Sequence, residues 1–299
     1  MPGFLTHYIA GKTALQATLH STPQLHQAIA PYEQLYNLGT LGPDVFFYYF
    51  PSQILKRSRG LAQEMHQGGM GLLIEQLACT ARQAEGQERD IIFAYMGGFL
   101  MHYVLDCHIH PYIYARSFKR GNVKIVNSLK HRRFESALDD ALLGLICDEK
   151  PAGVKQWQLI NAEGHSIAVS AEALRRGLAG VYKRKVSVQT IQRALKFTIH
   201  ATKVICSKNI DKLTETIILR EPTAVGDCDC LNMKKTPWRT PWPSEMCNDS
   251  FMERYSLALD EGISILESLY AFVYNGEVQP FVIANKLGNR SLKTGQQCA

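Results

Sequence analysis

The sequence predicts an all-α fold, a multi-helix bundle, and three observations support that prediction. Apolar residues recur at spacings of three and four along most of the chain, which is the period of one face of a helix. Glycine and proline fall between the periodic segments, where they end helices. The chain has 299 residues, of which 46% are hydrophobic, so it is long enough to bury a substantial core.

The first half contains five expected helical segments. In residue numbers they are 4–20, 23–38, 54–82, 89–110 and 127–147. Gly39 and Gly42 stop the second segment, and the turn-rich loop that follows it ends in a carboxylate, Asp44. The glycine cluster at 68–71 allows the third segment to be one broken helix or two. Pro111 ends or kinks the fourth, because proline lacks an N–H group and crowds the preceding turn.

The second half is also mainly helical, with a weaker signal. Residues 154–170 are short and mixed, which leaves a small hairpin open there, and helices are expected at 170–182, 187–218 and 250–275. Residues 221–249 are rich in proline and tryptophan and predict a long irregular excursion. The polar tail from Lys286 is expected to fray. We therefore expect a helical core at 1–150 and a helical C-terminal region at 151–299 that packs on it.

Charge and composition limit the partners and the location. A net charge of +6 is compatible with phosphorylated substrates but short of the clustered basic face of nucleic-acid-binding proteins, so no stable nucleic-acid complex is expected. Neither an exposed amphipathic helix nor a polybasic run is evident. No signal peptide and no transmembrane segment are expected. Eight cysteines without a CxxC pair fit a reducing compartment, and we expect a cytoplasmic protein.

Two pairs of side chains have the spacing of metal ligands, His102 with Asp106 and His131 with Glu135. Residues four apart on a helix project only about 40° from each other, roughly one turn apart, so an imidazole nitrogen and a carboxylate oxygen can share one cation. His110 lies a further turn along on the same side as His102. On the residues alone, a hydrogen-bonded core histidine or a surface charge pair stays open for either pair.

The surroundings of the first pair favour metal binding. Asp106 follows the apolar run 91–101, where an unpaired charge would be costly, and a metal ion or strong hydrogen bonding makes it tolerable. His108 falls about 240° from His102 on the helix and points elsewhere. Histidine and carboxylate ligands serve zinc, manganese and iron alike, so the residues leave the metal open. The core at 1–150 is thus expected to be a metal-binding unit.

Together these pieces resemble the zinc-dependent phospholipase C family, which is related to bacterial phosphatidylcholine-hydrolysing enzymes and to single-strand-specific zinc nucleases. The resemblance covers roughly residues 2–148. It rests on the order of the motifs, which are His7, Leu41-Gly-Pro-Asp44, His66, His102xxxAsp106xxxHis110-Pro111 and His131xxxGlu135. It implies the all-helical fold of that family and bound zinc.

The resemblance also implies ligand sets. One zinc would take His66, His102 and Asp106. A second would take Asp44, His110, His131 and Glu135, and a third would share Asp106 with His7. In secreted members a processed N-terminal tryptophan supplies its amine to the third metal, whereas this sequence begins Met1-Pro2, so two or three ions are expected.

The chemistry expected of such a site is metal-dependent hydrolysis of a phosphate ester, most naturally a phosphodiester, by a zinc-activated water without a covalent enzyme intermediate. Asp44 would orient or deprotonate that water. Phospholipid head groups and nucleotides both stay open as substrates, as does the oligomeric state. An HD-type phosphohydrolase would need an adjacent His-Asp dipeptide, which the chain lacks. A non-catalytic helical scaffold with zinc as a structural clamp is the alternative.

Overall fold

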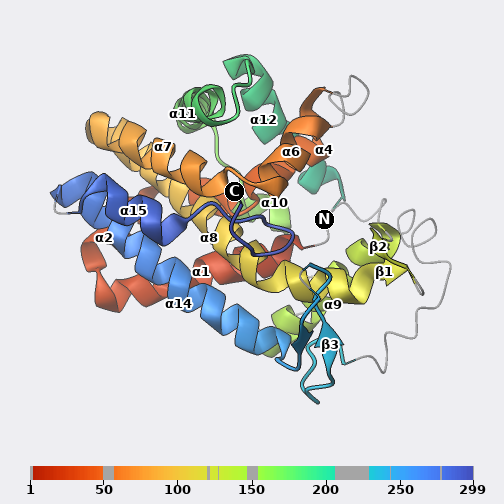
Figure 1. Cartoon of the computed structure of the whole chain (residues 1–299). Helices are drawn as coiled ribbons and strands as arrows, with labels where there is room; N and C mark the ends of the chain where they lie inside the picture. Colours follow the sequence, from red (N-terminus) through yellow and green to blue (C-terminus); the bar gives the residue numbers. More distant parts are fainter. Residues whose placement is uncertain are drawn as a thin grey trace.

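The computed structural model describes residues 3–49, 57–119, 122–126, 128–146, 154–205, 229–242, 244–276 and 278–298. Within these residues almost all regular structure is helical, and the strands form only two short antiparallel pairs. The predicted all-α class is therefore confirmed. Figure 1 shows the helices gathered around one long central helix, α8.

The first half follows the predicted order of helices with two interruptions. Its elements are α1 (Phe4–Ser21), α2 (Pro23–Ile29), a 3-10 turn η1 (Ala30–Tyr32), α3 (Glu33–Gly39), a 3-10 turn η2 (Gly42–Asp44), α4 (Val45–Tyr48), α6 (Arg57–Gln67), α7 (Met70–Gln83), α8 (Gly86–Ser117), β1 (Phe118–Lys119), β2 (Asn122–Val126) and α9 (Ser128–Ile146). The expected helix 23–38 is broken at η1, where Pro31 has no N–H group to donate. The segment 54–82 forms two helices that part at Gly69, whose φ of 82° favours glycine; residues 54–56 lie outside the described part.

Helix α8 does not end at Pro111. It continues to Ser117 with the proline inside it, and the prediction of an end there is wrong. The neighbouring elements support the helix through that point, because His110 and Pro111 are both buried and α9 packs alongside. The extra turns carry Tyr114 toward the side chains described below.

Helix α8 is the axis of the fold because it is buried on all sides. Most of its residues from Ile91 to Ile113 are buried, which is typical of a helix enclosed by others rather than one lying on a surface. Helices α3, α7 and α14 pack directly on it, and α1 and α9 cover its second half. Among the described helices, none combines the length and the apolar character needed to cross a bilayer.

Glycine lets α3 approach α8 closely. A Cβ atom on Gly98 would lie 1.9 Å from the carbonyl oxygen of Tyr36, and one on Gly39 would lie 2.3 Å from that of Tyr95. Only glycine avoids these overlaps without moving a backbone. The close crossing carries the chain after α3 past the middle of α8, where Thr40 and Gly42 lie against His102.

The second half contributes further helices. Its elements are α10 (Gln156–Leu159), α11 (Gly164–Val181), α12 (Val188–Ile205), β3 (Trp238–Arg239), β4 (Met246–Cys247), α14 (Phe251–Tyr270), a π-helical turn (Ala271–Asn275) and α15 (Pro280–Leu287). Residues 154–170 form α10 and the start of α11, so the alternative of a small hairpin there is wrong. The helix expected at 187–218 is observed to Ile205, beyond which it lies outside the described residues. The sequence did not predict α15.

Residues 229–249 contain the described part of the expected excursion, and 221–228 and 243 lie outside it. The strands β3 and β4 pair antiparallel, and Trp238 is buried against the ring of Tyr112. Ser250 then starts α14 with a capping box, in which its hydroxyl accepts from the Glu253 N–H and the Glu253 carboxylate accepts from the Ser250 N–H. Figure 1 shows α14 lying along α1 and α8.

The C-terminal tail is ordered against the core, and the prediction that it frays is wrong. Leu292 is fully buried, and its N–H donates to the carbonyl oxygen of His66 at 3.0 Å. Arg290 pairs with Glu261 of α14 through two hydrogen bonds of 3.2 and 2.6 Å. The polar composition of the tail did not indicate these contacts, because most of them are made by main-chain groups or by charged pairs between distant segments.

Candidate metal centre

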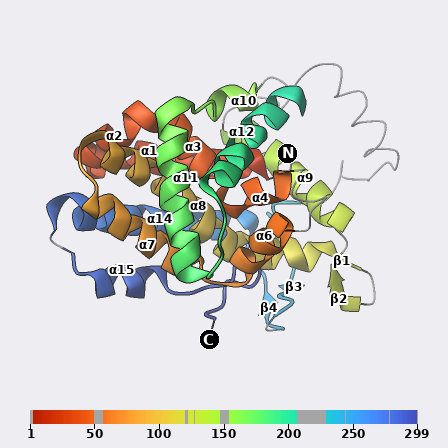
Figure 2. The same ribbon diagram turned by 90° about the horizontal axis from the view of Figure 1, so that it is seen from above.

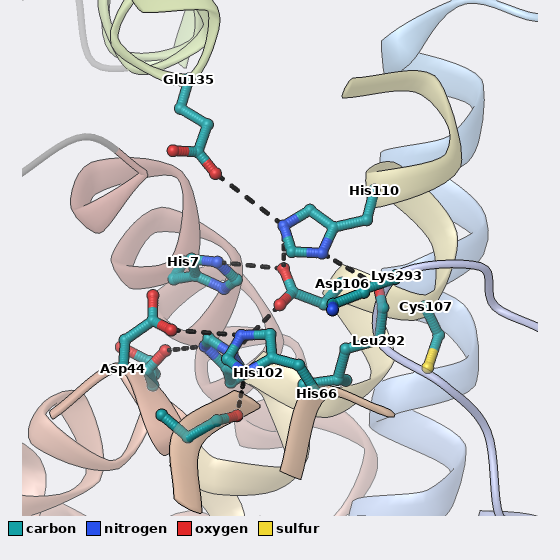
Figure 3. Close-up of polar contacts among 12 residues, drawn as sticks. His7, Asp44, His66, His102, Asp106, Cys107, His110, Glu135, Leu292 and Lys293 are labelled. Atoms are coloured by element: carbon teal, nitrogen blue, oxygen red, sulfur yellow. Dashed lines mark hydrogen bonds and ion pairs between the residues drawn. The ribbon is translucent and has the colours of Figure 1, made fainter. Parts of the chain in front are cut away.

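The eight side chains singled out from the sequence all converge around the buried middle of α8. They are His7 from α1, Asp44 from η2, His66 from α6, His102, Asp106 and His110 from α8, and His131 and Glu135 from α9. Figure 3 shows most of them pointing toward one another. In three groups, one donor atom from each residue lies within 4.8 Å of the others; the groups are His7, His102 and Asp106; Asp44, His66 and His102; and His110, His131 and Glu135.

Asp106 is the hub of the centre. Its Oδ1 atom lies 3.3 Å from Nε2 of His7 and 3.4 Å from Nε2 of His110, and its Oδ2 atom lies 3.1 Å from Nε2 of His102. The carboxylate is 1% exposed, so these imidazoles replace water as its surroundings. The rings of His7 and His102 stack with centroids 4.3 Å apart. One carboxylate thus faces three imidazole nitrogens.

Asp44 belongs with the imidazoles of His66 and His102. Its Oδ1 atom lies 3.3 Å from Nε2 of His66, and its side chain is 25% exposed. The resemblance implied Asp44 in a set with His110 and the α9 pair, which stays a prediction; the donor atoms of Asp44, His66 and His102 lie within 4.8 Å of one another. The turn η2 follows directly after the α3–α8 crossing, which explains why Asp44 arrives next to His102.

The third group joins α8 to α9. Nε2 of His131 lies 3.0 Å from Oε1 of Glu135, as the spacing of four predicts, and Nε2 of His110 lies 3.8 Å from the same oxygen. A cavity of about 10 Å³ adjoins this group and reaches His7. Its volume is close to that of one water molecule, so it has room for a single small species.

Main-chain carbonyl oxygens orient three of the imidazole rings. Nδ1 of His66 lies 2.7 Å from the carbonyl oxygen of Ala62, and Nδ1 of His102 lies 3.0 Å from that of Thr40. Nδ1 of His110 lies 2.9 Å from that of Leu292. A carbonyl oxygen only accepts, so each Nδ1 carries the proton and, in the neutral ring, each Nε2 presents a lone pair to the centre.

These lone pairs test whether the residues fit a metal. Nε2 of His102 and Oδ1 of Asp106 face the centre and are buried without a hydrogen-bond partner. Buried acceptors without donors are costly, and a cation that accepts imidazole nitrogen and carboxylate oxygen would satisfy them. Ring nitrogens held by a carbonyl on the far side are typical of metal-ligating histidines. The donor set fits zinc.

The electrostatics keep the carboxylates ionised. Burial raises the pKa of Asp106, but the imidazoles of His110, His102 and His7 outweigh it and hold that pKa well below the usual range. Burial likewise raises the pKa of Glu135, and His110 and His131 lower it overall. The three carboxylates of this largely buried centre, Asp44, Asp106 and Glu135, call for positive charge, which divalent cations supply.

His110 shows the reverse shift. Burial lowers the pKa of its imidazole, yet Asp106 and Glu135 outweigh burial and raise that pKa to about 9. In the metal-free protein His110 therefore carries a proton at neutral pH. A metal ion at Nε2 would displace that proton.

Asp139 anchors the start of α1, and sequence reasoning missed it. Its Oδ2 accepts from the N–H of Gly3 at 2.8 Å, and its Oδ1 accepts from the N–H and the hydroxyl of Thr6 at 2.8 and 2.6 Å. Burial raises the pKa of Asp139 to about 7, although the bonds from Thr6 lower it. Because Thr6 precedes His7, Asp139 fixes the position of that histidine. The spacing of four that links His131 and Glu135 continues to Asp139, which is the signal that could have revealed it.

Aromatic side chains border the third group. The ring of Tyr114 lies 4.8 Å from that of His131 and 6.0 Å from that of Trp242, which is 38% exposed. Burial and the neighbouring carboxylates raise the pKa of Tyr114, so its hydroxyl is neutral and can donate. Of the two tryptophans in the excursion, Trp242 borders the centre, whereas Trp238 packs in the core.

His108 lies apart from the centre, as its angle on the helix predicted. Its Nε2 atom lies 2.6 Å from Oε2 of Glu261 on α14. The same carboxylate binds Arg290, so His108 belongs to the attachment of α14 and the C-terminal tail.

Comparison with known proteins identifies a family. A family model described as zinc dependent phospholipase C matches residues 6–185. No curated protein and no solved structure matches the chain significantly. The matched region contains all eight converging side chains and extends beyond the expected limit at residue 148. Since it spans more than half of the chain, the protein belongs to the zinc-dependent phospholipase C family.

Proposed function

We propose that this protein is a zinc-dependent phosphodiesterase of the phospholipase C type. The observation that carries the proposal is the convergence on Asp106 of three imidazole Nε2 atoms at 3.1–3.4 Å, two of them on rings held from behind by carbonyl oxygens. A structural metal would need only one such set. Three adjoining sets support a polynuclear centre: the first two share His102, and the third is joined to Asp106 through His110.

The eight converging side chains are the proposed ligands, arranged in the three groups given above and holding two or three zinc ions. Bound zinc would polarise a phosphate oxygen and lower the pKa of a water molecule toward neutrality. Asp106, enclosed by imidazoles, would hold the groups together. His131 and Glu135 would complete the group beside Tyr114 and Trp242.

Asp44 is the proposed catalytic carboxylate. Its side chain is 25% exposed, against 17% for Glu135 and 1% for Asp106, so Asp44 is the carboxylate most open to a substrate and a water molecule. The pKa of Asp44 is lowered, because His66 and His102 outweigh the effect of burial. As an ionised acceptor it would orient the attacking water and take its proton.

The substrate class is a phosphate ester with an organic group that the border of the centre can contact. Tyr114 offers a neutral hydroxyl and Trp242 an exposed ring. A phospholipid head group and a nucleotide both present a phosphodiester or phosphoanhydride next to a group that such side chains can hold.

The test is metal content per chain in protein purified without chelator or metal-affinity tag, followed by hydrolysis of an aryl phosphodiester before and after chelation. We expect two or three zinc ions per chain and turnover that chelation abolishes and zinc restores. Bound zinc with no turnover of aryl, lipid or nucleotide esters would contradict the enzyme and leave zinc as a clamp between helices.

A further inference from the structure

The positive charge of the chain is concentrated in one helical hairpin, formed by α11 and α12. Between Gly164 and Ile205 the sequence has eight lysines and arginines and one acidic residue, a net charge of +7, whereas the whole chain carries +6. The rest of the chain therefore sums to −1. Figure 2 shows both helices in the outermost layer on one side of the molecule.

The exposed face of α12 is a basic stripe. Its residues recur at intervals of four and three and are all exposed; they are Gln189, Arg193, Lys196, His200 and Lys203. The opposite face, with Ile191 and Leu195, is buried in the core. At about 1.5 Å per residue the stripe is about 21 Å long. No acidic residue interrupts it.

The turn that precedes α12 extends this stripe. Lys183, Arg184 and Lys185 are exposed in it. Arg184 pairs with Glu64 of α6, and Lys203 lies over the ring of Trp157. In the described part of the chain, Lys185, Arg193 and Lys196 have no ion pair with a carboxylate. Their charge is thus available to an external partner.

The basic face adjoins the metal centre through α4. Helix α12 packs on α4, and the ring of Phe197 lies 5.8 Å from that of Tyr49. Helix α4 follows Asp44 directly, and its Phe47 ring lies 5.2 Å from the ring of His66. A partner bound along α12 would therefore lie beside the elements that position Asp44 and His66.

We propose that this surface, defined by Lys183, Arg184, Lys185, Arg193, Lys196 and Lys203, docks the protein on an anionic phospholipid surface. The choice of lipid rests on the proposed function, since a phospholipid substrate is presented by a bilayer. The stripe also lacks the exposed aromatic side chains on which single-stranded nucleic acids stack. Because its apolar side is buried in the protein, α12 would lie on the head groups without entering the hydrocarbon.

The expected strength follows from the number of cations. Each lysine or arginine close to an anionic membrane strengthens binding by about fivefold, and the effect fades beyond a Debye length. Removing three charges from the stripe should weaken binding roughly 100-fold. Raising the ionic strength should likewise weaken membrane binding by the native protein.

The experiment is co-sedimentation of the full-length, zinc-loaded chain with vesicles of phosphatidylcholine alone and with about 30 mol % phosphatidylserine. The test variant carries Lys185→Gln, Arg193→Gln and Lys196→Gln. The matched control carries Lys12→Gln, Lys234→Gln and Lys286→Gln, three exposed lysines outside the hairpin. We expect salt-sensitive binding to the anionic vesicles alone, lost roughly 100-fold in the test variant and kept within about twofold in the control.

Equal loss in both triple variants would overturn the surface, and so would binding that ignores phosphatidylserine. Single-stranded DNA that binds more tightly than the vesicles, through the same three residues, would overturn the lipid assignment. Hydrolysis of a soluble aryl phosphodiester separates the two proposals, because both triple variants should retain it. Vesicle binding by Asp106→Asn also separates them. If this variant binds vesicles without turnover, docking is supported independently of the proposed phosphodiesterase activity.

Discussion

The ring of His110 is held by the main chain of Leu292, whose carbonyl oxygen lies 2.9 Å from Nδ1 of the imidazole. The two residues are 182 positions apart. The N–H of Leu292 also donates to the carbonyl oxygen of His66. The main chain of one residue in the C-terminal tail thus contacts two candidate ligands, although the family match ends at residue 185.

Replacing Leu292 with proline should weaken zinc binding. Leu292→Pro removes the N–H that the carbonyl of His66 accepts, and changes at such supporting contacts typically cost about 10- to 100-fold in metal affinity. Leu292→Ala is the matched control, because it keeps both main-chain groups and loses only the buried side chain. Competition with a zinc chelator measures the zinc affinity of both variants. Equal zinc affinities would contradict the positioning role of this peptide.

Asp106→Asn should abolish activity and lower zinc content. The change removes the negative charge that faces His7, His102 and His110, and an amide is a poor zinc ligand. His108→Ala, on the same helix but paired with Glu261, should leave both quantities unchanged. Metal analysis and aryl phosphodiester hydrolysis on the two proteins decide the matter. Equal zinc loss would refute the ligand assignment.

Asp139→Asn should destabilise the start of α1. The amide cannot accept from both Gly3 and Thr6 as the carboxylate does, and an unsatisfied buried donor costs about 1–3 kcal/mol. Denaturant unfolding of the metal-free protein measures the change. The neighbouring Asp140→Asn, at an exposed position, is the control and should be close to neutral. If the two variants unfold at the same denaturant concentration, Asp139 is not an anchor.

Zinc binding should release protons and strengthen as pH rises. The pKa of His110 is raised to about 9 by Asp106 and Glu135 against the opposing effect of burial, so below that pH the metal-free ring is protonated. Zinc requires the neutral form, and the affinity should increase about tenfold per pH unit from this group alone between pH 6 and 9. Calorimetry in buffers of different ionisation enthalpy counts the protons. Zinc binding without proton release at pH 7 would contradict the raised pKa of His110.

Gly98→Ala should disrupt the crossing of α3 and α8. The added Cβ would lie 1.9 Å from the carbonyl oxygen of Tyr36, and the backbone shift needed to relieve it should cost about 3 kcal/mol. Gly144→Ala in α9 has open space around it and should instead stabilise by about 0.5–1 kcal/mol through helix propensity. Thermal unfolding of both variants provides the comparison. A neutral Gly98→Ala would show that the crossing is looser than described.

Much of the first half could be predicted because its signals are local. The spacing of three and four places α1, α7, α8 and α9 within a few residues of their observed bounds, apart from the C-terminal end of α8. The order of the motifs likewise identified all eight converging side chains as candidate ligands. Their mutual distances were beyond a one-dimensional pattern, however, and the association of Asp44 with His66 depends on how α3 crosses α8.

The parts that sequence reasoning missed depend on long-range contacts. Local rules allowed the helix to end at Pro111, but the helix continues to Ser117 because neighbouring elements enclose it. The tail after α15 looked polar and loose, yet Leu292 is buried by α6 and α8. The basic surface escaped notice because its charges are spread from Lys183 to Lys203 and gather only when α12 presents one face to solvent. The domain division at residue 150, the cytoplasmic location and the oligomeric state stay untested.

The contact between Leu292 and His110 has a consequence for biosynthesis. The last proposed ligand, Glu135, precedes Leu292 by 157 residues. At about 5–20 residues per second, a ribosome needs roughly 8–30 s to add that length. Every proposed zinc donor therefore leaves the ribosome well before the peptide that orients His110. The nascent chain passes through a period in which it can capture zinc without the final ring geometry, and the centre matures only after Leu292 has emerged.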